Sequence, residues 1–156
     1  MKKIFLLAAM IALSSSCSND EKASENETAT IIGKWQLTDI LESGKPISGY
    51  SCNKEYDTNQ FVANDRSVVS YSDKNANNLC VQFFEEQTYT IVDNVLTETQ
   101  KNGSIKIYEA KYKIKELKNS SLKLERISLF EANSNGSNPM TTNYTTDEEV
   151  KVYKKI

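Results

Sequence analysis

The chain has 156 residues, a formal net charge of −2 and no histidine. The lack of histidine excludes a Ser-His-Asp triad, a Cys-His dyad and the His-rich kind of zinc site. The basic residues are scattered, so there is no electrostatic footprint for nucleic acid. We therefore expect a protein that is not an enzyme, holds no metal or cofactor and binds no nucleic acid.

The first sixteen residues have the layout of a secretory signal. Lys2 and Lys3 give a positive start, and an apolar run follows from Ile4 to Leu13 before three serines. These ten residues are too few to cross a bilayer, because a spanning helix needs roughly 20 apolar residues. We predict a signal peptide at 1–16 that is cleaved.

The segment "LSSSC" resembles the lipobox of bacterial lipoproteins. The resemblance implies that Cys17 is acylated, for example with palmitate, and becomes the new N-terminus, with the membrane as its partner. Asp20 and Glu21 are similar to the sorting signals of surface lipoproteins in the Bacteroidetes. The expected location is the bacterial cell envelope, as an outer-membrane lipoprotein on the periplasmic face or the cell surface. The alternative is an ordinary signal peptide with an incidental cysteine.

Residues 17–30 are predicted to form a flexible tether. The stretch "SNDEKASENETAT" has no aromatic and no large apolar residue. Such a segment cannot bury enough surface to offset the entropy lost on ordering. The folded part is then a single domain over 31–156, which is long enough to bury a hydrophobic core.

The domain is predicted to be all-β. Apolar residues tend to alternate, and turn residues interrupt them every eight to fifteen positions, which is typical of antiparallel strands. Eight strands joined mostly by short turns favour an up-and-down barrel, because closure removes exposed edges. Its interior has room for side chains or one small ligand. The predicted strands lie near 32–41, 56–63, 67–72, 81–92, 95–100, 105–114, 121–130 and 150–155.

Short turns and one irregularity are predicted between these strands. Asn64-Asp65 and Asp93-Asn94 are placed as short turns, and Asn102-Gly103 as a type I′ turn that needs positive backbone dihedrals. The alternation changes parity between Ile107 and Tyr108, which predicts a β-bulge at this point.

Two cysteines, Cys52 and Cys80, remain if Cys17 carries a lipid. In an exported protein, an even number of remaining cysteines favours a disulfide. Closing a loop of about 29 residues would stabilise the fold by roughly 3.5 kcal/mol. The alternative, a metal or redox pair, has no nearby CxxC motif to support it.

The opening "IIGKWQLTDILESGK" resembles that of the lipocalin-like lipoproteins of the Bacteroidetes. Gly33 and Trp35 match the Gly-x-Trp motif on the first strand of that family, and later runs such as "TYTIVDNVLTE" are similar in order and spacing. The resemblance implies a lipocalin-like barrel whose closed end is covered by Trp35. Lipocalins proper pack an arginine of the last strand over this tryptophan, and here Lys154 or Lys155 is expected in its place.

Candidate ligand contacts follow from the same strands. Tyr89, Tyr108 and Tyr112 lie in alternating segments and are predicted either to line a cavity or to pack in the core. Trp35 is expected in the core, with ligand stacking as the alternative. The stretch 131–149 has no periodicity, and such long loops are either functional lids or idle surface segments.

The predicted function is the binding of a small hydrophobic molecule inside the barrel. The alternative is a structural or protein-interaction module of the cell envelope with a barrel filled by side chains, in which the segment 131–149 contacts a partner. A large internal cavity would favour the first hypothesis, and a packed interior the second.

Overall fold

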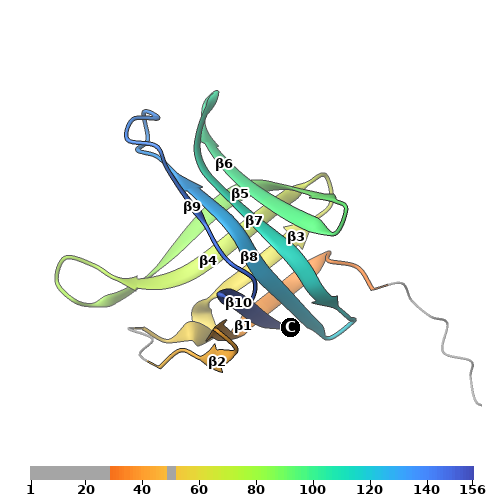
Figure 1. Ribbon diagram of the computed structural model, residues 1–156. Helices are drawn as coiled ribbons and strands as arrows, with labels where there is room; N and C mark the ends of the chain where they lie inside the picture. Colours follow the sequence, from red (N-terminus) through yellow and green to blue (C-terminus); the bar gives the residue numbers. More distant parts are fainter. Residues whose placement is uncertain (1–28, 49–51) are drawn as a thin grey trace, which may run out of the picture.

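The computed structural model describes residues 29–48 and 52–156, and it is almost entirely β (Figure 1). The predicted signal peptide, Cys17 and nearly all of the predicted tether lie outside the described residues. No helix in the described part of the chain is long and apolar enough to cross a membrane. The elements are β1 (Gly33–Glu42), β2 (Lys45–Pro46), the 3-10 helix η1 (Lys54–Tyr56), β3 (Thr58–Val62), β4 (Arg66–Lys74), β5 (Cys80–Val92), β6 (Val95–Asn102), β7 (Ile105–Leu117), β8 (Ser121–Glu131), β9 (Met140–Asn143) and β10 (Glu149–Lys155).

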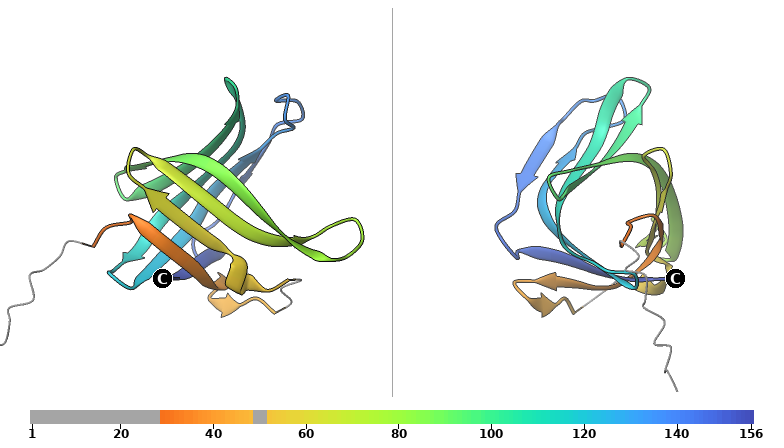
Figure 2. Two further views of the ribbon diagram at one scale, coloured as in Figure 1. Left: turned by 180° about the vertical axis from the view of Figure 1, so that it is seen from behind. Right: turned by 90° about the vertical axis from the view of Figure 1, so that its right-hand side faces the viewer.

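Eight of the strands form a closed antiparallel barrel. Neighbours pair in the order β1-β3-β4-β5-β6-β7-β8, and β10 closes the ring by pairing with both β8 and β1. The view along the barrel in Figure 2 shows this ring. The short strand β2 pairs with the last two residues of β1, and β9 pairs with the end of β8. The predicted all-β, eight-stranded barrel is therefore confirmed.

Two of the predicted turns have the required geometry, and one is shifted. The central residues of the turns at Asn64-Asp65 and Asp93-Asn94 all have positive φ, as type I′ turns require. At the third hairpin, however, Asn102 pairs with Ile105, so that Gly103 is the first turn residue and not the second. The prediction of a type I′ turn centred on Asn102-Gly103 is wrong by one residue. Glycine still takes the positive φ, at 62°.

The predicted bulge lies where β7 begins to pair with β6. Gln100 pairs with Tyr108 and Lys101 pairs with Lys106, so Ile107 is the extra residue. A bulge reorients the side chains on either side of it. Ile107 and Tyr108 consequently both face the interior cavity described below.

The hydrophobic core fills one end of the barrel around Trp35, which is completely buried. The indole Nε1 donates a hydrogen bond of 2.6 Å to the carbonyl oxygen of Ile31, so its polar group is satisfied. The Nζ atom of Lys155 lies 5.2 Å from the ring centroid of Trp35. Lys155 therefore takes the position expected for the arginine of lipocalins. The other core residues are Ile31, Leu37, Phe61, Tyr89, Leu96, Ala110, Tyr112, Ile114, Leu122, Leu124 and Tyr153.

The structure explains why the first position of the Gly-x-Trp motif, Gly33, is a glycine. Its φ of 135° is one that side chains rarely allow, and a Cβ atom there would lie 2.5 Å from Cε of Lys155. The glycine thus leaves space for the lysine that crosses to Trp35.

Replacing Gly33 with alanine is expected to lower the free energy of unfolding by about 1–3 kcal/mol, because the new side chain imposes backbone strain. Urea denaturation would measure the loss. The matched control is Gly33→Ala combined with Lys155→Ala, which frees the space but not the backbone. If the double variant lost no more stability than Lys155→Ala alone, strain at φ would not be the cause.

The predicted disulfide is present. Cys52 and Cys80 are joined, with their Cα atoms 5.6 Å apart. The bond ties the segment before η1 to the first residue of β5.

The long segment before β10 is not a structureless loop. Residues Met140–Asn143 form β9, whose four residues are all exposed, and Met140 is 59% exposed. Tyr144 instead packs inward, and the centroid of its ring lies 5.4 Å from Cζ of the Arg126 guanidinium. The turn before β9 is joined to the β6–β7 hairpin by a hydrogen bond of 2.9 Å from Asn102 Nδ2 to the carbonyl oxygen of Ser134. Both project from the same end of the barrel in Figure 1.

Candidate functional site: the barrel cavity

The barrel contains a half-open cavity of about 460 Å³. This volume lies within the usual range of small-molecule sites, roughly 300–1,000 Å³. Every barrel strand except β1 contributes to its lining, which is about equally polar and apolar. The lining residues are Asn59, Val69, Tyr71, Glu85, Gln87, Glu98, Gln100, Ile107, Tyr108, Tyr112, Glu131, Ala132, Lys151 and Tyr153.

The structure brings together two of the four aromatic residues predicted as ligand contacts. Tyr108 and Tyr112 both line the cavity. Tyr89 does not: its ring packs edge-on against Phe61 with centroids 5.1 Å apart, and its hydroxyl donates a hydrogen bond to the carbonyl oxygen of Val62. Trp35 is also absent from the lining and belongs to the core below it.

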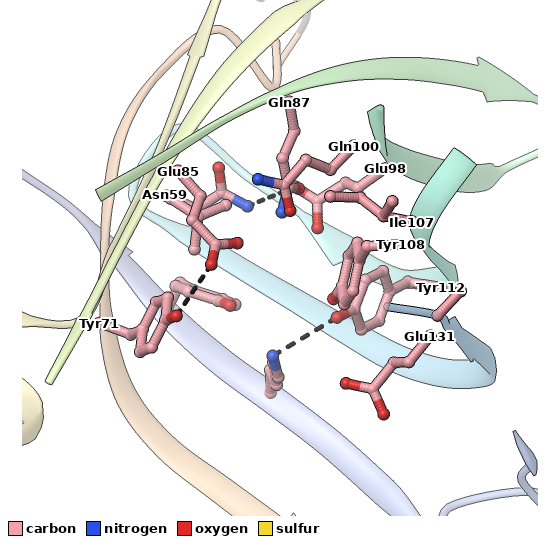
Figure 3. A pocket seen from close by; sticks show the side chains of 14 residues that line it. Asn59, Tyr71, Glu85, Gln87, Glu98, Gln100, Ile107, Tyr108, Tyr112 and Glu131 are labelled. Carbon is pink, nitrogen blue, oxygen red and sulfur yellow. Dashed lines mark hydrogen bonds between the residues drawn. The ribbon is translucent and has the colours of Figure 1, made fainter. Parts of the chain in front are cut away.

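Polar groups gather at one end of the cavity, where Asn59, Gln87, Glu98 and Gln100 lie close together (Figure 3). Glu98 is only 4% exposed, and its Oε1 accepts a hydrogen bond of 2.5 Å from Asn59 Nδ2. Burial raises the pKa of Glu98, although Asn59, Lys151 and Arg126 oppose the shift. The buried carboxyl is thus destabilised in its charged form.

Replacing Glu98 with glutamine is expected to raise stability near neutral pH and to change it little in acid. A raised pKa in the folded state means that the contribution of Glu98 is fully present below its ordinary value of 4.5 and is lost as the pH rises through the folded value. Glutamine keeps the acceptor for Asn59 without the charge. Thermal unfolding at a series of pH values would measure the effect. A variant less stable than the parent throughout that series would contradict it.

A second polar group surrounds the hydroxyl of Tyr112. Arg126 Nη2 donates to it at 3.2 Å, and Lys151 Nζ donates at 3.4 Å. Arg126 Nη1 also contacts Glu149 Oε2 at 2.8 Å, and both side chains are largely buried. Arg126, Glu98 and Lys151 are not among the site residues predicted from the sequence. A signal existed for two of them, because Arg126 shares strand parity with Leu122 and Leu124, and Glu98 shares it with Leu96.

Breaking this buried ion pair should have a measurable cost. Arg126→Met is expected to lower the free energy of unfolding by about 2–3 kcal/mol, because Glu149 loses its partner in a poorly hydrated site. The control is Arg66→Met, since Arg66 and Glu86 form a pair of the same 2.8 Å length whose side chains are 59% and 73% exposed. That change should cost at most about 1 kcal/mol. Equal losses in chemical denaturation would show that burial does not set the strength of the pair.

The opposite wall carries a third polar contact. The Tyr71 hydroxyl donates a hydrogen bond of 2.8 Å to Glu85 Oε1. Burial, followed by this hydrogen bond, raises the pKa of Tyr71 to about 12. Tyr71 and Tyr108 therefore both act as neutral hydrogen-bonding groups at physiological pH, since burial also raises the pKa of Tyr108.

The lining of the cavity supplies hydrogen-bonding groups and aromatic rings. Within residues 29–48 and 52–156, no group of three or more histidine, cysteine or acidic side chains is placed to hold a metal ion. The lining instead combines flat tyrosine rings with fixed donors and acceptors, which can orient a small molecule.

A family model and two solved structures are similar to this chain. A family model described as a lipocalin-like domain matches residues 31–124, more than half of the chain. A lipocalin-like protein from Bacteroides uniformis is similar at 13% identity and a TM-score of 0.46, with 80% of this chain and 97% of that chain covered. An uncharacterized protein from Bacteroides eggerthii is similar at 14% identity and a TM-score of 0.49, with 80% and 98% covered. A search of curated proteins finds no match.

Proposed function

We propose that this chain, which belongs to the lipocalin-like family, binds a small molecule inside its barrel. The observation that carries the proposal is the cavity of about 460 Å³, which side chains leave unfilled. A purely structural module would have no use for such a volume, so the cavity favours binding over the alternative of a packed interaction module. The role is binding and not catalysis.

The polar lining changes the class of ligand that we expect. Carboxylates, amides and tyrosine hydroxyls make up about half of the wall, and a wholly hydrophobic ligand would offer no hydrogen bond to the two among them that lack a partner, Asn59 Oδ1 and Gln87 Oε1. The apolar surface comes from groups such as Val69, Ile107 and the tyrosine rings. A ligand with both polar and apolar parts fits this wall better than the hydrophobic molecule predicted from the sequence.

Blocking the cavity tests this proposal. Gln100→Trp places a large ring in the lining from β6, whereas Thr99→Trp places the same ring on the opposite face of that strand. Native mass spectrometry of gently purified protein, together with an NMR screen of a small-molecule library, should detect ligands in the parent and in Thr99→Trp but not in Gln100→Trp. If no molecule bound in a manner sensitive to Gln100→Trp, the proposed function would be wrong.

We further propose that the chain is an exported lipoprotein anchored by acylated Cys17, which holds the barrel at the envelope membrane. Support comes from the resemblance of "LSSSC" to a lipobox. In cells fed labelled palmitate, the parent should incorporate label and fractionate with the outer membrane, whereas Cys17→Ser should do neither. A labelled Cys17→Ser protein would overturn the anchor.

A further inference from the structure

The cavity carries more negative than positive groups. Three carboxylates, Glu85, Glu98 and Glu131, line it, and the ammonium of Lys151 is the one cationic group among the lining residues. The Nζ atom of Lys151 donates to the Tyr112 hydroxyl and lies 5.5 Å from the centroid of that ring, so its hydrogen bond goes to Tyr112 and not to a carboxylate. At the polar end around Glu98, the acceptors include the carboxylate and the amide oxygens of Asn59 and Gln87.

Two of these acceptors have no donor. Asn59 and Gln87 are 3% and 6% exposed, and both line the cavity. Across the described residues, Asn59 Oδ1 and Gln87 Oε1 are among the few buried side-chain atoms that lack a hydrogen-bond partner. A buried acceptor without a donor costs free energy, and native proteins rarely keep one without a reason. Two such atoms beside a buried carboxyl indicate a missing group that donates hydrogen bonds.

We propose that the ligand of this barrel carries a positively charged nitrogen, of the organic ammonium class, which binds at the Asn59, Gln87 and Glu98 end of the cavity. Its N–H groups donate hydrogen bonds to the unpartnered amide oxygens of Asn59 and Gln87, and its positive charge offsets the negative charge of the buried Glu98 carboxylate. The apolar part of the same molecule lies along the wall formed by Tyr108 and Tyr112 (Figure 3). This inference rests on the proposed function, because it names the ligand class of the same site.

Other ligand charges fit the lining less well. An anion would face three carboxylates, with Lys151 already held by Tyr112. An uncharged apolar molecule would leave Asn59 Oδ1 and Gln87 Oε1 without donors. Burial raises the pKa of Glu98 even though Asn59, Lys151 and Arg126 act against the shift, and a bound ammonium would add a further favourable charge interaction with this carboxyl.

Three probes with one skeleton test the charge preference by calorimetric titration of the purified protein. They are 2-phenylethylamine, which is an ammonium at neutral pH, the neutral 2-phenylethanol and the anionic 3-phenylpropanoate. Hydrogen bonds to charged groups are the stronger ones, so the amine should bind roughly tenfold more tightly than the alcohol, and the anion more weakly than both.

Matched variants connect the preference to the named residues. Glu98→Gln should abolish the preference for the amine, whereas Glu86→Gln, on the exposed face of β5, should preserve it. Gln87→Met, which removes one acceptor and leaves Glu98 in place, should weaken binding of the amine by roughly fivefold. Thermal unfolding of each variant would confirm that it is folded.

The outcomes separate this inference from the proposed function. Amine preference that depends on Glu98 supports both. Equal or tighter binding of the alcohol or the anion, lost in Gln100→Trp, would overturn the ammonium class and leave the binding role intact. If neither these probes nor the library bound in the cavity, both proposals would fail. Preference for the amine that survived in Glu98→Gln and in Gln87→Met would overturn the assigned end of the cavity.

Discussion

Replacing Trp35 with alanine is expected to lower the free energy of unfolding by about 3–5 kcal/mol, the largest loss that we anticipate from a single substitution. Trp35 is completely buried in the core, where its ring lies under Lys155. The alanine variant leaves a cavity at the closed end and removes the donor to the Ile31 carbonyl. Urea denaturation followed by circular dichroism would measure the loss.

The control for Trp35→Ala is Tyr56→Ala, which removes an aromatic side chain that is 55% exposed. Such a surface change should alter stability by about 0.5 kcal/mol or less. If Trp35→Ala cost no more than the control, the closed end of the barrel would not depend on this ring. Trp35→Phe should fall between the two, since it keeps most of the apolar contact but loses the hydrogen bond.

Removing the disulfide should have an effect nearly as large. Replacing Cys52 and Cys80 together with alanine is expected to lower the free energy of unfolding by about 3.5 kcal/mol, because the unfolded chain regains the freedom of a long closed loop. The two cysteines are 28 positions apart and join the segment before η1 to β5. Urea denaturation with and without a reductant would measure the contribution.

A thiol reductant supplies the control for the disulfide. It should destabilise the parent by a similar amount and leave the double alanine variant unchanged. If the reductant reached the bond, as verified by thiol labelling, and stability did not fall, the bond would not support the fold.

Most of the barrel could be predicted from the sequence because a two-residue period is a strong signal when one face is buried. The strand predicted at 121–130 is observed as Ser121–Glu131, and the bulge at Ile107 was visible as a change of parity. Strand β9 was not predicted, because all four of its residues are exposed and therefore show no alternation of apolar and polar positions. The shifted turn at Gly103 reflects the fact that glycine suits either central position of a tight turn.

The cavity was harder to predict than the fold. Strand parity places Tyr89 and Tyr108 on inner faces, but it does not give their height along the barrel, and height decides which one reaches the cavity. The carboxyl of Glu98 and the amide of Gln87 were missed because polar residues on strands are ordinarily assigned to the solvent side. A polar interior breaks that rule, and such local conflicts are expected at functional sites.

Closure of the ring between β1 and β10 constrains the order in which this protein can be assembled. Trp35 pairs with Lys155, and the hydroxyl of Thr38 donates to the carbonyl of a residue 114 positions later, Val152. Contacts of such long range form late and slow folding. During synthesis or export from the N-terminus onward, one edge of β1 stays open until the seven residues of β10 arrive. Before that moment the nascent chain is most vulnerable to aggregation through this edge.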